Sequence, residues 1–382
     1  MSTRADELPL VSEVSTHAGE RTFARWRQRE IVALTSLAFL LIVVFVLSLI
    51  LGSTWLPLND VVHALTGTAP RESAAAMVVN AIRLPRALTA MLAGAALGIA
   101  GLQMQTLFRN PLADPFALGI SSGASLGVAL VVLGTGLGTG LGTGVGTGYG
   151  AATVAAAFGL RGDALVTVAA ISGASLVLGL VVLVSARVTS STTVLLLGLM
   201  FGYAVSAGVT VLISASQPER LQQWAEWGFG SFSGVTWARL RIFGPLTFIG
   251  VLMAAATTKQ LNVLLLGERY ARSMGLPVRR ARLMTMLGAS VLGAVVTAFC
   301  GPIAFLGIAV PHLCRGLLGT ADHRPLVPAV VLMGGTMALL AQIISLLPGS
   351  AGVLPLNAVT SLLGAPVVIT VLMRHRLAGV PR

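Results

Sequence analysis

Charged residues are scarce in this chain. Only 10% of its 382 residues are charged, whereas 55% are hydrophobic and the mean hydropathy is +0.89. Soluble domains carry about 25% charged residues, which cover their water-facing surface. The composition therefore excludes a soluble globular protein and indicates a chain that has lipid as its solvent.

Motifs of several enzyme and metal-binding classes are also missing. The two cysteines, Cys300 and Cys314, form neither a CxxC pair nor a Cys/His cluster, so buried thiols are the favoured interpretation. The sequence has no GxxxxGK[ST] loop for ATP hydrolysis and no HExxH motif, and a membrane enzyme is disfavoured. We expect no catalytic residue, no metal site and no cofactor bound by this chain.

Long apolar runs predict membrane-spanning helices. Lipid permits only helices and closed barrels, and a run such as 31–51 is too long and too continuous for a barrel strand. Because a span needs about 20 apolar residues, we predict an all-α, polytopic transmembrane helical bundle of about ten helices. The predicted spans are 31–52, 86–107, 116–134, 164–186, 192–213, 239–258, 282–300, 303–318, 326–347 and 358–373.

Basic residues lie mainly between the apolar runs. Arginines crowd the stretch just before the first span, and the connector 259–282 is the richest basic loop. The net charge of +12 thus fits the positive-inside pattern of membrane proteins and does not indicate nucleic-acid binding. We predict cytoplasmic termini, with tails at 1–30 and 377–382 around a helical domain at 31–376.

A glycine-threonine run occupies residues 134–150. Glycine at every second position disfavours both helix and strand, so we predict a flexible, non-cytoplasmic insertion between the third and fourth spans. A GxxxG packing face is disfavoured because the glycines are spaced by two residues and not by four.

Two arginines, Arg83 and Arg86, open the second span within the segment RLPR on the predicted outer face. Their spacing of three places them on nearly one side of a helix start. Two interpretations stay open. The arginines either snorkel at the interface or form a docking site for acidic side chains of an external partner.

Helix-breaking residues mark predicted structural turns near two span ends. The stretch 109–115 holds Asn110, Pro111, Asp114 and Pro115, and a re-entrant turn is favoured over a part of the transport path. The second group contains Gly301, Pro302, Pro311 and His312. For His312 a structural hydrogen bond is favoured over a proton relay or a metal ligand, because no second ligand lies at suitable spacing.

The basic connector contains a segment the size of a short helix. Gly267 and Gly275 bracket it, and an apolar face would be formed by Leu264, Leu265, Leu266, Tyr270 and Met274. That face either lies on the lipid interface or inserts into a groove of a cytoplasmic partner. The predicted coupling residues are Leu266, Gly267, Glu268, Arg269, Ala271, Arg272, Met274 and Gly275.

Taken together, these segments resemble the ferric-siderophore, haem and cobalamin permease family of type II ABC importers. The match runs in order over nearly the whole chain from residue 31. Its motifs are RLPR at 83–86, QxQxxxRNPLADP at 103–115, GISSGA at 119–124, WxxGSF at 227–232, GExxAxxxG at 267–275, AFxGPIAFxG at 298–307, PHLxR at 311–315, DHR at 322–324, LP at 354–355 and GAP at 364–366.

The resemblance implies a permease in the bacterial inner membrane that works as two copies of a ten-helix subunit. Two cytoplasmic ATP-binding subunits, which hold the ATP and Mg, would dock on the loop around 267–275. A periplasmic substrate-binding protein would dock outside, where Arg83 and Arg86 match positions that pair with its acidic residues. The expected substrate is an iron chelate, haem or a ferric siderophore, with cobalamin as the alternative.

The chain departs from the family pattern near the outer end of the ninth span. Gln342 stands where relatives often have an acid, and Leu346 where they have an arginine. Val353 replaces a usual glutamate and Asn357 a common glycine. These departures bear on how the binding protein docks and not on the fold.

For the mechanism, we expect the helix around 268–274 to carry the ATPase motion into the membrane. The path would be lined by the fifth span, with Gly198, Gly202, Ser206 and Gly208 as candidate lining residues. An ion-coupled secondary transporter is the alternative from another class, but the predicted spans contain almost no Asp or Glu for ion coupling.

Overall fold

The computed structural model describes residues 11–378 except 69, 71–72, 135–161, 186, 189 and 347–352. Almost all of the glycine-threonine run, residues 135–150, lies outside the described residues, as do the chain ends at 1–10 and 379–382. The predictions made for these segments therefore stay predictions.

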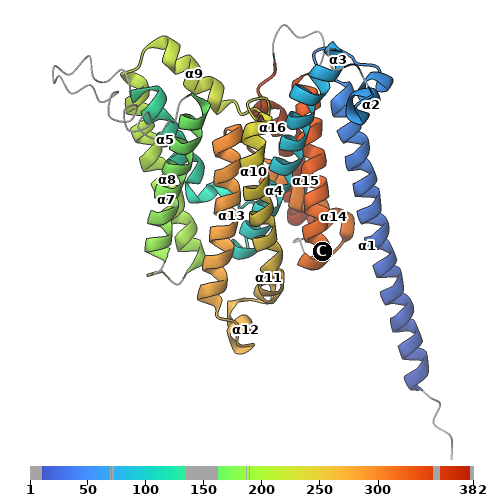
Figure 1. Ribbon diagram of the computed structural model, residues 1–382. Helices are drawn as coiled ribbons and strands as arrows, with labels where there is room; N and C mark the ends of the chain where they lie inside the picture. The colour runs from blue at the N-terminus through green and yellow to red at the C-terminus, as the bar shows by residue number, and fades with distance from the viewer. Residues whose placement is uncertain are drawn as a thin grey trace, which may run out of the picture.

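All regular elements of the described part are helices, which confirms the predicted all-α bundle (Figure 1). Seven of them are long and apolar enough to cross a membrane, and three shorter apolar helices fall on the three remaining predicted spans. The long helices are α1 (Val11–Ile50), α4 (Leu84–Phe108), α7 (Asp163–Ser185), α8 (Ser191–Ser214), α10 (Trp237–Ala256), α13 (Val278–Cys300) and α15 (His323–Ser345). The shorter apolar stretches are α5 (Ile120–Val132), α14 (Leu306–Leu318) and the part Leu356–Thr370 of α16 (Leu356–Ala378).

Short helices fill the connections, which the apolar runs do not predict. A 3₁₀ turn, η2 (Pro115–Leu118), precedes α5, and a π-helical turn, η1 (Val78–Arg83), leads into α4. The others are α2 (Leu58–Thr66), α3 (Ala74–Met77), α9 (Pro218–Gly228), α11 (Thr258–Leu265) and α12 (Glu268–Ser273). Helix α1 also begins earlier than its predicted span, at Val11, inside the stretch predicted as a tail.

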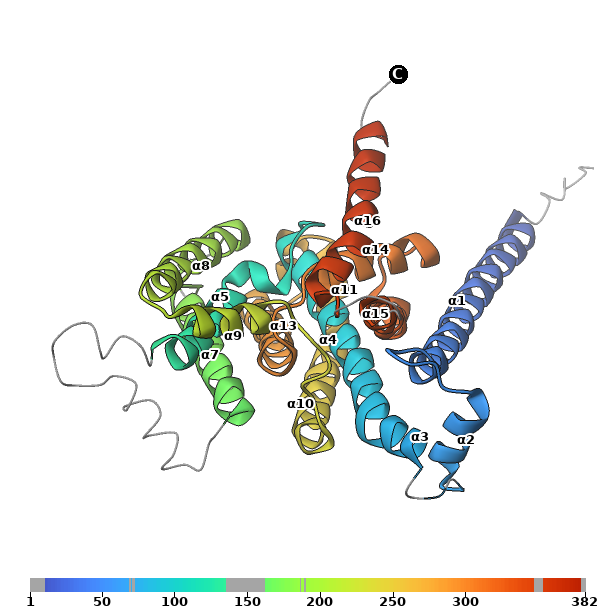
Figure 2. The same ribbon diagram turned by 90° about the horizontal axis from the view of Figure 1, so that it is seen from above.

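Helix α4 is the centre of the bundle (Figure 2). It packs against α10, α13, α14 and α15, and nearly all of its side chains after Thr89 are buried. Alanine and glycine dominate this helix, so the neighbouring backbones approach it closely. Gly94 faces the backbone of Gly334 on α15, and Gly101 faces the backbone of Gly307 on α14. The core therefore rests on small residues.

Helices α5, α7 and α8 form a second group beside this centre (Figures 1 and 2). Helix α12 lies at one end of the bundle, and α2, α3 and α9 lie at the other (Figure 1). The beginning of α1 lies on the side of α12, so the N-terminal arginines and the basic connector share one end of the molecule (Figure 1). This arrangement is what the predicted topology requires.

Candidate functional site

The connector between α10 and α13 folds back on itself at the end of the bundle. Helix α11 ends at Leu265 and α12 spans Glu268–Ser273. Gly267 and Gly275 flank α12 with φ angles of +111° and +80°, backbone conformations that favour glycine. The predicted bracketing of a short helix by these two glycines is confirmed.

The apolar face predicted for this connector is divided in two. Leu264 and Ala271 are buried against the start of α13, where they form a small core of their own. Leu266, Tyr270 and Met274 are instead exposed, with 61%, 69% and 62% of their surfaces accessible. Three large apolar side chains at the tip of a basic loop form a surface that suits a partner. We call these three residues the connector tip.

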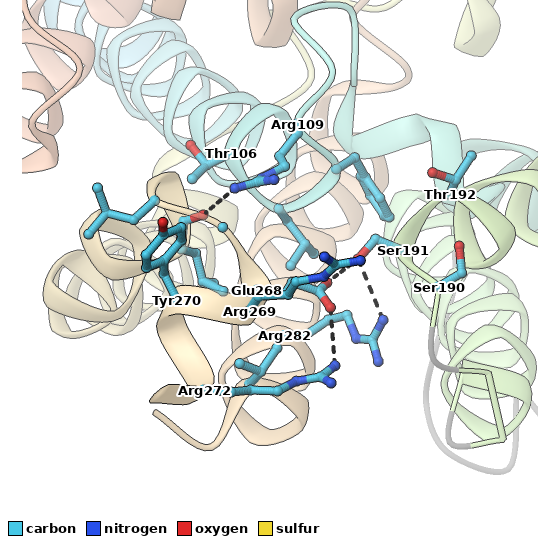
Figure 3. Close-up of a pocket in the computed structure, with 16 residues that line it drawn as sticks. Thr106, Arg109, Ser190, Ser191, Thr192, Glu268, Arg269, Tyr270, Arg272 and Arg282 are labelled. Atoms are coloured by element: carbon cyan, nitrogen blue, oxygen red, sulfur yellow. Dashed lines mark hydrogen bonds and ion pairs between the residues drawn. The ribbon is translucent and has the colours of Figure 1, made fainter. Parts of the chain in front are cut away.

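A cleft of about 820 Å³ opens beside the connector tip (Figure 3). Its walls come from the end of α4, the start of α8 and the α11–α13 region, including Glu268, Arg269, Arg272 and Arg282. Arg109, the first residue after α4, has a left-handed backbone with φ +49°. Its Nη2 donates to the carbonyl oxygens of Leu264 and Leu265, both at 3.3 Å, and so fastens the end of α11 to the central helix.

Glu268 lies between α12 and α8 in this cleft (Figure 3). Its Oε1 accepts a hydrogen bond from Ser191 Oγ at 3.0 Å, and its Oε2 pairs with Arg272 Nη2 at 3.3 Å. Arg282 is buried, and its Nη1 and Nη2 lie 3.5 Å from Ser191 Oγ and 3.4 Å from the Val188 carbonyl oxygen. Several predicted coupling residues therefore converge on one cleft. No motif in the sequence indicates that Ser191 belongs to this cleft.

At the opposite end of the bundle, the two predicted docking arginines have different surroundings. Arg83 is buried, and its Nη1 donates to the carbonyl oxygens of Leu49 and Ile50 at 2.8 and 2.7 Å, while its Nη2 donates to that of Thr54 at 2.6 Å. Arg83 thus closes the C-terminal end of α1, whose last carbonyls have no helical partner. The docking roles predicted for Arg83 and Arg86 both stay predictions.

Removing the Arg83 guanidinium is expected to destabilise the fold. In Arg83→Gln the carbonyl groups at the end of α1 lose charge-assisted hydrogen bonds, so we expect the free energy of unfolding to fall by about 2–4 kcal/mol. Thermal unfolding in detergent measures this change. Arg86→Gln is the matched control and should unfold like the unmodified protein. Equal stability of all three proteins would contradict the role given to Arg83.

Arg86 lines a pocket of about 220 Å³. Three positions where the chain departs from the family pattern, Gln342, Leu346 and Val353, line the same pocket. Within the described residues, Arg86 Nε and Gln342 Oε1 are buried without a hydrogen-bond partner. The departures from the family pattern therefore cluster around Arg86.

The predicted turns are present. Asn110 Oδ1 accepts from the backbone N–H of Leu112, and Asp114 Oδ1 accepts from that of Phe116, which holds the break between α4 and η2. Gly301 ends α13 with φ +75°. Pro311 lies inside α14, and His312 Nδ1 is 2.9 Å from the carbonyl oxygen of Ile308 one turn earlier, which is the structural hydrogen bond expected of it.

The four predicted path residues lie on different faces of α8. Gly198 and Gly202 are buried and pack against the backbone of Leu118 and Gly119, so they serve the packing of α8 on η2 and α5. Ser206 is exposed and 3.3 Å from Ser122 Oγ, and Gly208 is also exposed. The large exposed side chains of α8 are those of Leu196, Leu199, Met200, Tyr203 and Val211. A path along α8 would therefore meet bulky apolar groups and not the first two glycines.

Two polar residues whose contacts the sequence motifs do not indicate, Asn357 and His323, hold the bundle together. Asn357 Oδ1 accepts from the backbone N–H of Ala304 at 2.9 Å, and its Nδ2 donates to the Gly228 carbonyl oxygen at 3.0 Å. His323 is buried, with Nδ1 2.7 Å from Asn262 Oδ1 and Nε2 2.9 Å from Thr106 Oγ1. The latter contacts fasten α11 to α15 and α4. Two features of the sequence point to these residues. Asn357 stands where relatives commonly have glycine, and His323 belongs to the DHR segment.

Comparison with known proteins agrees with this arrangement. Residues 40–374 match the FecCD transport family. The chain is 36% identical over 364 residues to the vitamin B12 import system permease protein BtuC of Klebsiella pneumoniae subsp. pneumoniae, which covers 95% of this chain and 98% of that protein. The corresponding protein of Shigella boydii serotype 18 is 35% identical over 357 residues, covering 93% and 99% of the two chains.

A solved structure of a metal-chelate type ABC transporter in an inward-facing conformation superposes with a TM-score of 0.73. The two chains are 27% identical, and the match covers 89% of this chain and 98% of the other. The fold, the motif order and the relatives lead to one conclusion. The chain belongs to the FecCD transport family and is the membrane-spanning permease subunit of an ABC importer.

Proposed function

We propose that this permease imports a metal chelate across the bacterial inner membrane, as part of a complex with four other polypeptides. These are a second copy of the chain, two cytoplasmic ATP-binding subunits and an external substrate-binding protein. Both termini and the α11–α13 connector face the cytoplasm. The observation that supports the proposal most strongly is the connector tip, where Leu266, Tyr270 and Met274 are exposed beside a basic cleft.

The connector tip has the chemistry of a docking element. A short helix that presents large apolar side chains fits a groove on a partner, and the surrounding arginines favour a partner with acidic side chains. The ATP-binding subunits would supply hydrolysis. This chain would receive their motion at α12, while Arg109 and the contacts of His323 fasten α11 to the central helix.

Cobalamin is the first substrate candidate, because the relatives with 35–36% identity over more than nine tenths of the chain are named as vitamin B12 permeases. An iron chelate, haem or a ferric siderophore, is the second candidate, because the permease family that the motif blocks resemble includes importers of these chelates. Both are large metal chelates. The bulky apolar face of α8 suits the passage of such a molecule without a tight polar site.

Reconstituted transport tests the proposal. The permease would be assembled in liposomes with the ATP-binding and substrate-binding proteins of its own organism, and uptake of radiolabelled cyanocobalamin, haem and a ferric siderophore would be measured. We expect ATP-dependent uptake of cyanocobalamin that an uncoupler leaves intact. ATP-driven uptake of haem or siderophore alone would select the second candidate. Uptake that survives ATP removal but collapses with the uncoupler would contradict an ATP-driven importer.

A further inference from the structure

The start of α8 is held by the connector and not only by its neighbours in the bundle. Along its length α8 packs mainly on α5, η2 and α7, and its other side is exposed. Its first residue, Ser191, points into the cleft beside α12 (Figure 3). The position of the α8 start therefore depends on what Ser191 contacts.

The Ser191 hydroxyl has a partner on each side. It donates to Glu268 Oε1 at 3.0 Å, and it lies at accepting distance from Arg282 Nη1 at 3.5 Å. The Glu268 carboxylate thereby lies near the N-terminal end of α8, where a negative charge is favoured by the helix dipole. A hydrogen bond to a charged group is also stronger than one between neutral groups.

The other contact of Glu268 is weaker. Arg272 lies one turn further along α12, and its side chain is 62% exposed, whereas that of Glu268 is 33% exposed. Exposed pairs of this spacing contribute little in water. Within the described contacts, the bond to Ser191 is the one that joins Glu268 to another helix.

The two halves of the connector have different attachments. Helix α11 is fastened to the buried centre, through Arg109 at the end of α4 and through the hydrogen bonds of Asn262 with Asp322 and His323. Helix α12 reaches the less enclosed α8 through Glu268. If the ATP-binding subunit displaces the connector tip, α11 would therefore stay in place, whereas α8, which is less enclosed, could move with α12.

We propose that the Ser191–Glu268 hydrogen bond is a mechanical link that makes the start of α8 follow α12 during the transport cycle. Both are positioning residues, since neither needs to touch the substrate. This inference rests on the proposed function, because it assigns α12 to the contact with the ATP-binding subunit. Glu268 would then have a second role, in addition to stabilising the N-terminus of α12 by its negative charge.

The test compares three variants of the assembled complex in liposomes. Ser191→Ala removes the hydroxyl and Ser191→Thr keeps it. Ser172→Ala is the control, because it removes a serine hydroxyl that donates to the Val168 carbonyl oxygen within its own helix, α7. Two quantities are measured, substrate taken up per ATP hydrolysed and the affinity of the ATP-binding subunit for the permease. We expect Ser191→Ala to lower uptake per ATP about tenfold with unchanged affinity, while the other two variants stay close to the unmodified complex.

Several results would overturn the link. These are normal uptake per ATP in Ser191→Ala, an equal fall in Ser191→Thr, or a loss of affinity for the ATP-binding subunit that explains the fall. If Ser191→Ala does not assemble, Glu268→Ala, which removes the acceptor of the same hydrogen bond, replaces it and must lower uptake per ATP. If the unmodified complex does not need ATP, the proposed function itself fails. If the unmodified complex shows ATP-driven uptake and Ser191→Ala transports equally well, only the proposed link is wrong and the proposed function stands.

Discussion

Replacing Leu266, Tyr270 and Met274 by serine is expected to abolish ATP-driven uptake. The three side chains are large, apolar and exposed at the end of the bundle that carries the basic connector. A side chain that anchors an interface contributes about 2 kcal/mol, or about 30-fold in affinity. Losing three such anchors would weaken docking of the ATP-binding subunit by more than about a thousandfold. Binding of that subunit and uptake into liposomes measure the effect.

A matched control comes from the opposite end of the molecule. Val62 and Leu65 on α2 are also exposed apolar residues outside the long helices, with 47% and 48% of their surfaces accessible. Changing both to serine should leave the binding of the ATP-binding subunit unchanged. A triple variant of the connector tip that still binds and transports normally would show that the ATP-binding subunit docks elsewhere.

Gly101→Leu is expected to prevent accumulation of folded permease. A Cβ atom at Gly101 would overlap the carbonyl oxygen of Gly307, which is backbone and cannot rotate away. Helices α4 and α14 would have to separate at the centre of the bundle. The cost should exceed the about 1–3 kcal/mol of ordinary overpacking, because here a helix must move and not a side chain.

The measurement is the yield of monodisperse protein on size exclusion in detergent. Gly179→Ala is the control, since Gly179 lies on α7 with nothing within 4 Å of the added Cβ. That variant should be produced like the unmodified protein. Normal yield and thermal stability of Gly101→Leu would mean that α4 and α14 do not pack as closely as described.

The helices were the easier part to predict, because apolar runs long enough for a membrane are visible in the sequence. Gly267 and Gly275 were also informative, since each marks a backbone conformation that glycine favours. The short helices α2 and α9 were not predicted, because their segments contain polar residues and no long apolar run. The early start of α1 was not predicted for the same reason.

The face on which a residue lies was harder to predict. Arg83 and Arg86 share a motif, yet Arg83 turns inward to the end of α1, a contact with residues more than 28 positions away. Gly198 and Gly202 suggested a path, but their lack of a side chain serves close packing against η2 and α5. Ser191 looks like any helix-starting serine until α12 is placed beside it. Such roles depend on tertiary contacts that residue type and spacing do not encode.

The location of the connector tip decides the whole account, and chemical labelling tests it most directly. Cys300 and Cys314 are buried, with 3% and 0% of their surfaces accessible, so a cysteine at position 270 provides a distinct site for a membrane-impermeant maleimide. In Tyr270→Cys we predict labelling in inside-out vesicles, none in intact cells, and protection when the ATP-binding subunit is bound. Labelling from outside intact cells would contradict the topology, the docking role of α12 and the link to α8 together.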